Sequence, residues 1–570
     1  MTLDLPPAEN ASLTVEGRRS GRWLKVIEVL LAVVVAAASL TSAYGVLWGD
    51  TKIALLPIAA VVAVAMAALA FTRFSAFVLL LLGVRPILDA VKISGKTSGT
   101  AAGNTVADRG LDPSALVVVL FLLAAVLWFA ARVASGAWVQ LSPLSWALLA
   151  FLVAGLLSVI VAIKPQASAM EWLRISSVAA MFLVLEQLIT SRTTMMRVIA
   201  ACYVGLLLPV LYTVGGMVLG YQVSEAHSSL SRLSGPFNQS NIFARYLAFL
   251  VVFAIAILPY VGRRWRLPLA ALTLISIVFM ALSVTLTAIL GTALAVVLIA
   301  VLQRRSRLLI SLVAAGVLAL TFLPGLASRL MTLDSEREIG GGASGSSLTW
   351  RFQYWAEVLP LANRNPWAGI GLTGTQYLTS EQKQPHNDLI RAYVETGVVG
   401  LVAYVAVLVA LVVTVRAALR RATAGTLEYA VAAGAAGVVV AFIASSFFAN
   451  VMSNVVSVWY VVAFVAAAGF VARTGSNESP DTDLHLPGAR PGVSDRLAVR
   501  GQHPASVGLT TGAGTTFAPL KRLFAATKYL RRLLDRSISV NEFGPSTPFA
   551  IPPAWKSLAP IAALQRITTS

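Results

Sequence analysis

Long apolar stretches separated by short polar segments recur along most of the chain. Each stretch is close to the about 20 residues that a helix needs to cross a bilayer. The apolar positions do not alternate with polar ones as they do in the strands of a membrane β-barrel. Because backbone groups in lipid must then bond within their own helix, the pattern predicts membrane-spanning helices at 24–46, 53–71, 75–91, 113–133, 144–163, 169–190, 198–220, 242–261, 267–283, 287–303, 308–324, 394–415, 427–448 and 452–472.

The predicted fold class is all-α, a polytopic transmembrane bundle of about 12–14 spans. The two spans between 267 and 303 are short and share a tight turn, so a re-entrant hairpin remains an alternative for them. The predicted organisation is a cytoplasmic N-terminal segment 1–23, transmembrane helices 24–324, a large periplasmic loop 325–392, transmembrane helices 393–472, and a basic, largely disordered cytoplasmic tail 473–570.

Composition supports this organisation. Hydrophobic residues make up 57% of the chain and charged residues only 12%, whereas soluble proteins carry about 25% charged residues. The net charge of +19 does not indicate nucleic-acid binding, because the basic residues cluster in short loops that the predicted topology places on one side, the cytoplasmic side. We therefore expect a multi-pass protein of the bacterial inner membrane with both ends in the cytoplasm. The basic loops hold Arg73, Arg192, Arg197 and the clusters at 263–266, 304–307 and 416–421.

The tail is rich in Pro, Gly, Ser and Thr, a composition typical of disorder. Within it, basic and apolar residues alternate from 520 to 540. This segment is either an amphipathic helix on the anionic inner leaflet or part of a solvated regulatory tail, and both interpretations stay open.

The loop 325–392 is the one long segment that the topology places outside. Its acidic and basic residues nearly balance, and the positions 348–361 have the spacing of an amphipathic helix, with Trp350, Tyr354 and Leu361 among its apolar residues. Long ordered loops in compact folds are usually functional. We therefore expect the chemistry of the protein to lie in or beside this loop.

Three polar groups near outward-facing helix ends are candidates for that chemistry. The first runs from Arg232 through Gly235 and Pro236 to Asn241. Glycine and proline indicate a turn, Asn241 is predicted to cap the following helix, and Arg232 can bind phosphate oxygens in a bidentate manner. The alternative is a plain loop with an interfacial anchor.

The second group centres on Arg351, which is flanked by Trp350, Phe352, Tyr354 and Trp355. Aromatic faces can stack on sugar rings, and an arginine can hold a pyrophosphate. The alternative is an aromatic belt at the membrane interface.

The third group is Pro385-His386-Asn387-Asp388, followed by Arg391. His386 is the one of four histidines that is predicted at the mouth of a span, and histidine is the usual general base near neutral pH. A structural histidine is the alternative. With one cysteine, Cys202, no external His/Asp/Glu cluster and no glycine-rich phosphate loop, neither a metal nor another cofactor is expected.

Taken together, the groups resemble the O-antigen ligase and Wzy polymerase family of membrane glycosyltransferases. The matching pieces are Arg232-x-x-Gly235-x-Phe237-x-x-x-Asn241, Arg351-x-x-x-Trp355, Pro366-Trp367-x-Gly369-x-Gly371 and His386-Asn387 with Glu395 and Gly397. They span roughly residues 190–450. One departure lies in the turn at 283–288, where Leu286 occupies the position of an arginine in many family members.

The resemblance implies a metal-independent, inverting transfer of a glycan from undecaprenyl diphosphate to an acceptor on the periplasmic face. The implied acceptor is a glycan or lipid A-core in O-antigen or exopolysaccharide synthesis. Other polysaccharide-assembly proteins are further implied partners. His386 is then the general base, and Arg232, Arg351, Asn241, Asn387 and Arg391 bind substrate. A flippase for lipid-linked sugars and a non-catalytic export component are the rival functions.

Overall fold

The computed structural model describes residues 41, 44, 51–88, 90, 113–137, 139–227, 230–322, 337–339, 343–345 and 347–475. The chain divides into two units, Met1–Asp481 and Thr482–Ser570, and all described residues belong to the first. Most of the predicted span 24–46, the external loop 92–112 and the tail with its predicted helix at 520–540 lie outside the described residues.

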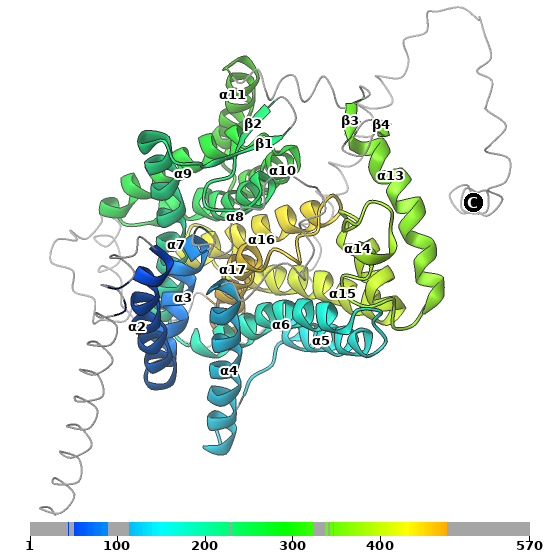
Figure 1. Ribbon diagram of the computed structural model, residues 1–570. Helices are drawn as coiled ribbons and strands as arrows, with labels where there is room; N and C mark the ends of the chain where they lie inside the picture. Colours follow the sequence, from blue (N-terminus) through cyan, green and yellow to red (C-terminus); the bar gives the residue numbers. More distant parts are fainter. Residues whose placement is uncertain are drawn as a thin grey trace, which may run out of the picture. The chain divides into compact units, whose positions relative to one another are not determined.

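Helices form nearly all of the regular structure in the described part of the chain (Figure 1). Two 3-10 segments, η2 (Leu258–Tyr260) and η3 (Leu359–Arg364), extend α8 and α13. The α-helices are α2 Thr51–Thr72, α3 Phe74–Leu88, α4 Pro113–Ala134, α5 Pro143–Ile160, α6 Pro165–Leu188, α7 Arg192–Leu219, α8 Ser240–Ile257, α9 Arg263–Leu282, α10 Leu286–Leu302, α11 Ser306–Phe322, α13 Ser347–Val358, α14 Thr375–Leu378, α15 Asp388–Arg421, α16 Leu427–Ser446 and α17 Val455–Thr474.

Among the described residues, nine helices are long and apolar enough to cross a membrane, and four shorter apolar helices accompany them. Every predicted span from 53–71 onward overlaps one of these helices. The prediction of an all-α polytopic fold is confirmed, and the protein is a multi-pass membrane protein. The predicted helix at 348–361 is likewise present, as α13 and η3.

Two details differ from the prediction. The helix expected at 394–415 begins earlier, at Asp388. Asn387 caps it, and the charged residues of its first turns form hydrogen bonds with polar partners. Two short antiparallel hairpins also interrupt the helical pattern, β1 (Ser224–His227) with β2 (Leu230–Leu233) and β3 (Arg337–Ile339) with β4 (Ala343–Gly345). Strands of three or four residues are too short to produce a readable alternation.

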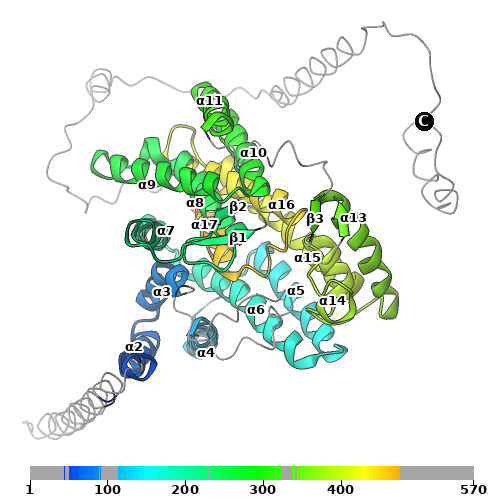
Figure 2. The same cartoon turned by 45° about the horizontal axis from the view of Figure 1, so that its top comes forward.

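The centre of the bundle is α17, in which Val455–Val471 is buried without interruption. It packs against α6, α8, α15 and α16 (Figure 2). Small residues such as Ala467 and Gly469 allow the close approach of helices that stabilises membrane bundles. The Tyr460 hydroxyl donates to the Leu82 carbonyl of α3 at 2.5 Å, so the core helix also ties in the N-terminal helices.

Several contacts join segments near helix ends that the predicted topology places on the same side of the membrane. On the predicted outer side, the Ser168 hydroxyl donates to the Leu372 carbonyl (2.6 Å), and the Val451 amide donates to Asp388 Oδ2 (3.0 Å). On the predicted inner side, Arg192 pairs with Glu428 (3.1 Å). These contacts join loops that the topology places at the same membrane surface, and the outer ones surround the start of α15.

Candidate active site

The first turns of α15 are interrupted at Gly397, whose backbone has φ 69° and ψ −171°. The interruption frees helical hydrogen-bonding groups, and the Pro366–Gly371 segment satisfies them. The amides of Ile370 and Gly371 donate to the carbonyls of Val394 and Glu395, both at 3.1 Å, and the Val398 amide donates to the Pro366 carbonyl at 2.8 Å. The Pro-Trp-x-Gly-x-Gly motif therefore docks the external loop onto the broken helix.

Two glycines permit this close approach of backbones. A Cβ on Gly369 would lie 2.4 Å from the carbonyl carbon of Glu395, and a Cβ on Gly397 would lie 2.2 Å from the carbonyl oxygen of Trp367. Both residues also have positive φ values, 74° and 69°, which side-chain-bearing residues rarely adopt. The close packing of the two backbones thus explains why Gly369 and Gly397 are glycines.

Arg391, in the first turn after the cap, is buried at the junction of four segments. Its Nε donates to Glu395 Oε2 (2.8 Å), its Nη2 to Glu171 Oε1 of α6 (2.9 Å), and its Nη1 to the Ser453 hydroxyl. Glu395 Oε1 accepts from the Thr375 hydroxyl of α14 at 2.6 Å. Charges removed from water require such partners, so Arg391 acts as a structural junction.

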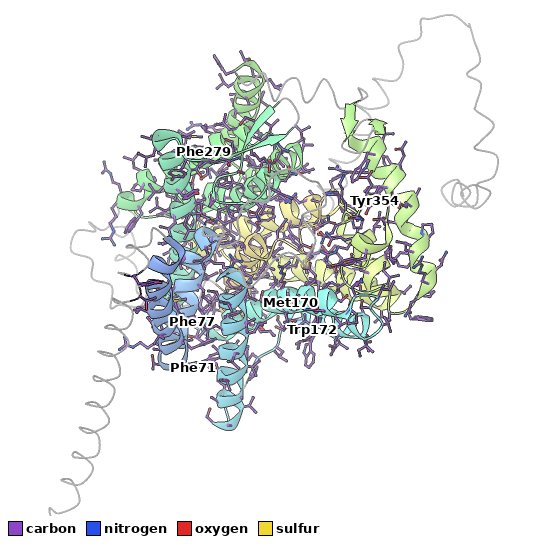
Figure 3. The ribbon with its side chains drawn as sticks, viewed as in Figure 1. Phe71, Phe77, Met170, Trp172, Phe279 and Tyr354 are labelled. Carbon is purple, nitrogen blue, oxygen red and sulfur yellow. The ribbon has the colours of Figure 1, made fainter. Side chains whose placement is uncertain are left out.

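The helix α13 holds the segment that carries His386. The Trp355 Nε1 donates to the Pro385 carbonyl at 2.6 Å, and the Tyr354 hydroxyl donates to the Lys383 carbonyl. Tyr354 is buried on the side of α13 that faces α14 and α15 (Figure 3). The Trp350 ring stacks on Tyr354, with centroids 5.2 Å apart, and meets the His386 ring edge-on at 5.8 Å.

His386 lies in a cationic environment. The Lys383 ammonium lies 5.1 Å from the centre of the Trp350 ring that borders the imidazole. Burial lowers the pKa of His386 from its usual 6.5 to about 3, with further lowering by Arg351, Arg245 and Lys383. The imidazole is therefore neutral at pH 7, which is the form that accepts a proton.

Arg232, on β2, is 2% exposed and reaches the turn between α9 and α10. Its Nε donates to the Ser283 carbonyl (3.0 Å), and its Nη2 donates to Thr285 Oγ1 (2.9 Å) and Asn241 Oδ1 (2.7 Å). The predicted cap role of Asn241 is wrong, because α8 begins at Ser240 after Gln239, and the Asn241 side chain contacts Arg232. The sequence motif contains both Arg232 and Asn241, but it predicts neither their hydrogen bond nor their contact with the turn.

Arg245 was not among the predicted site residues. It lies on α8, four residues after Asn241, is 6% exposed, and interacts electrostatically with Asp388, Arg351 and Arg232. A single arginine within an apolar span was the available signal, since ionisable residues inside membrane helices are usually functional.

The structure thus assigns the predicted residues to different places. The charges of Arg351 and Arg245 both act on His386, and the charge of Arg232 acts on Arg245. Asn387 Oδ1 instead accepts from the Leu389 and Ile390 amides, at 2.9 and 3.1 Å, as the cap of α15. In the described part of the chain, no cluster of three His, Cys, Asp or Glu residues is arranged to hold a metal ion. The roles of the predicted residues in substrate binding stay predictions.

This arrangement is that of a multi-pass membrane protein in which the segment Pro366–Gly371 docks onto a broken helix near several basic residues. Residues 269–405 match the family model described as O-Antigen ligase. The matched region runs from α9 into α15 and includes His386, Arg351 and the Pro366–Gly371 segment, so the chain carries a region of the O-antigen ligase family and the resemblance seen in the motifs is confirmed. A search of curated proteins finds no match.

Proposed function

We propose that the protein transfers a glycan from undecaprenyl diphosphate to an acceptor hydroxyl during the synthesis of surface polysaccharide. The observation that carries the proposal is the position of His386. Its neutral imidazole lies among Arg351, Arg245 and Lys383 and against the face of the external loop that holds Trp350. A base beside several cations suits a reaction that removes a proton from one partner and stabilises an anion leaving the other.

The proposed reaction is a single displacement. The acceptor oxygen forms a bond to the anomeric carbon while the bond from that carbon to the diphosphate oxygen breaks. The proton of the acceptor hydroxyl passes to the free ring nitrogen of His386, and the lipid diphosphate leaves with the electron pair. Cations fixed near the leaving oxygens stabilise the charge that develops there, and attack from the opposite face inverts the anomeric centre.

The donor itself adjusts the base. Without it, nearby cations disfavour the imidazolium form of His386. A bound diphosphate brings negative charge to these cations and so raises the pKa of His386 toward its usual value. The residue then becomes a stronger base when the donor is present, which limits proton uptake in the empty site.

The remaining predicted residues support the site. We propose that Arg351 contacts the diphosphate, because its charge acts on His386, and that Arg232 and Asn241 hold the turn between α9 and α10. Asn387 and Arg391 position His386, since one caps α15 directly after it and the other anchors the same turn to α6.

The proposed location is the periplasmic face of the inner membrane. The site lies at the ends of α8, α9 and α15 that the distribution of basic loops places outside. Lipid-linked glycan reaches this face from the bilayer, while a lipid A-core or growing glycan acceptor approaches from the periplasm.

A reconstitution experiment separates this function from that of a flippase. Purified protein in detergent, where no two membrane sides exist, is mixed with undecaprenyl-diphosphate-linked glycan and acceptor. The proposal predicts a new glycosidic product together with free undecaprenyl diphosphate. Absence of product with both substrates present, alongside movement of the donor across vesicle membranes, would identify a transporter instead.

The acceptor is identified in cells. If the protein is a polymerase, a deletion strain retains single repeat units on lipid A. If it is a ligase, polymer accumulates on undecaprenyl diphosphate. Either pattern specifies the acceptor class, and unchanged surface glycan would contradict both.

A further inference from the structure

Arg245 is a buried cation without a protein partner for its Nε. Arg245 is only 6% exposed. Its Nε atom has no hydrogen-bond partner among the described residues. A charged group withdrawn from water without pairing is costly, and in a membrane span such a residue is normally functional. The fold therefore leaves one donor of this buried cation unpaired.

The position of Arg245 directs it toward the outer end of α8. Asn241 and Arg245 are four residues apart and share one helix face, and long side chains on a helix point back toward its N-terminus. Asn241 contacts Arg232 on that face at 2.7 Å. The positive end of the helix dipole lies at the same end of α8, and the N-cap residue Gln239 makes no side-chain capping bond.

The charges around Arg245 do not balance it. Arg351 and Arg232 repel it, and Asp388 is the acidic group that attracts it. Yet Asp388 uses its Oδ2 to accept from the amides of Val451 (3.0 Å) and Met452 (3.4 Å), and its buried Oδ1 has no partner among the described residues. Arg245 and Asp388 therefore attract each other without forming an ion pair in the described structure.

We propose that Arg245 is a binding residue for the diphosphate of the lipid-linked donor. A diphosphate has the charge to neutralise Arg245 and Arg351 together, and a guanidinium matches two phosphate oxygens in one plane. Arg232 at the same end already bonds to the turn 283–285, whereas the Nε of Arg245 has no hydrogen-bond partner among the described residues. The inference rests on the proposed function and names a further residue of the same site.

The test measures binding apart from turnover. Undecaprenyl diphosphate is titrated into the full-length protein in lipid nanodiscs, with undecaprenyl monophosphate and inorganic pyrophosphate as the comparison probes. For Arg245→Met we expect about 10- to 100-fold weaker binding of undecaprenyl diphosphate, the loss typical of one charged hydrogen bond. Arg245→Lys, which keeps a point charge without the planar fork, is expected to lie between this variant and wild type.

Arg305→Gln is the matched control. Its Nη1 donates to the Ile255 carbonyl (3.2 Å), so this arginine also contacts α8 but at the opposite end. Binding by this variant is expected to equal that of wild type. Weaker binding of the lipid diphosphate than of pyrophosphate by wild type would assign the site to free phosphate compounds rather than to the lipid donor and would overturn the proposal.

Thermal stability provides the second measurement. A structural arginine would stabilise the empty protein, whereas a cation that awaits a ligand is a cost to it. We expect the ligand-free Arg245→Met variant to melt at or above the wild-type temperature and to lose the stabilisation that undecaprenyl diphosphate gives wild type. A variant that melts much lower than wild type and still binds the diphosphate normally would overturn the inference.

The outcomes separate the inference from the proposed function. If wild type binds undecaprenyl diphosphate and Arg245→Met binds it equally well, Arg245 has no role in the site while the proposed function stands. If wild type and variant both fail to bind any lipid diphosphate, the donor of the proposed function is wrong, and the inference is overturned with it.

Discussion

The Arg232 guanidinium of β2 donates to the Thr285 hydroxyl at 2.9 Å, across 53 positions of sequence. Through this bond the hairpin preceding α8 supplies a cation to the turn between α9 and α10, in which residues 283–286 include no basic side chain. The structural role of Arg232 is defined by its bonds to this turn.

Removing the acceptor at this turn tests that structural role. In Thr285→Val the Arg232 donor loses a buried partner, so we expect a destabilisation of about 1–3 kcal/mol. Thr287→Val is the control, because the Thr287 side chain makes no hydrogen bond within the described structure. Thermal unfolding in detergent measures both, and equal melting temperatures for the two variants would contradict the assigned role.

The docking of the external loop onto α15 is tested at Gly397. In Gly397→Ala the new Cβ meets the Trp367 carbonyl oxygen at 2.2 Å, so loop and helix must separate, and we expect loss of most activity and a lower melting temperature. Gly475→Ala is a close control. Gly475 has a similar backbone, φ 70° and ψ −158°, but its nearest neighbour would be 3.6 Å away.

The two glycine variants share the cost of an unfavourable backbone conformation, about 1–3 kcal/mol. Their difference therefore reports the crowding between the Trp367 carbonyl and residue 397. If Gly397→Ala is no more harmful than Gly475→Ala, the proposed docking does not constrain the site.

The structural junction at Arg391 is tested by Arg391→Met. Glu171 and Glu395 lose their shared partner and remain buried, and breaking a buried ion pair in this way costs about 3–5 kcal/mol. Arg174→Met is the matched control, because Arg174 also pairs with Glu171 (3.4 Å) but is partly exposed. We expect a large fall in melting temperature for the first variant and a small one for the second, measured by the loss of folded protein on heating.

The sequence predicted most of the helical architecture because apolar runs of spanning length leave few alternatives in lipid. It also identified the stretch from Pro366 to Gly371 as a motif, but not its function. The reason is that the motif forms backbone hydrogen bonds with α15 around Gly397. Hydrogen bonds between segments distant in the sequence do not change the local pattern of apolar and polar residues.

The site was predicted only in part. The charge of Arg351 acts on His386, and both residues belong to the loop predicted at 325–392. Arg245 was missed, because within an apolar run one arginine carries no sign of which direction it faces. The positions of Asn387 and Arg391 in the sequence indicate a functional role. In the structure, the Asn387 side chain caps α15, and the Arg391 side chain forms ion pairs with Glu171 and Glu395.

The pH dependence follows from the lowered pKa of His386, about 3 in the empty site. For this base the neutral form is active, so activity falls as pH falls through its pKa. The kcat/KM for the donor reports the free enzyme and kcat the donor complex. Because the bound diphosphate raises the pKa, we expect the acid limb of kcat to lie at higher pH than that of kcat/KM.

Steady-state rates at saturating acceptor, measured from about pH 3 to about pH 8, test this relationship, because that range includes both the lowered pKa of His386, about 3, and the usual histidine pKa of about 6.5. The order of the two limbs carries the argument rather than their absolute positions. Coincident limbs, or a limb of kcat at the lower pH, would contradict donor-dependent tuning of His386.

The central claim is that His386 accepts the proton of the acceptor during glycan transfer. The most direct measurement is single-turnover product formation by purified His386→Gln with undecaprenyl-diphosphate-linked glycan and acceptor, beside a titration of donor binding. Loss of a general base costs about 10²- to 10⁴-fold in rate, so we predict a fall of that size with donor binding close to that of wild type. Wild-type turnover by the variant would contradict the claim.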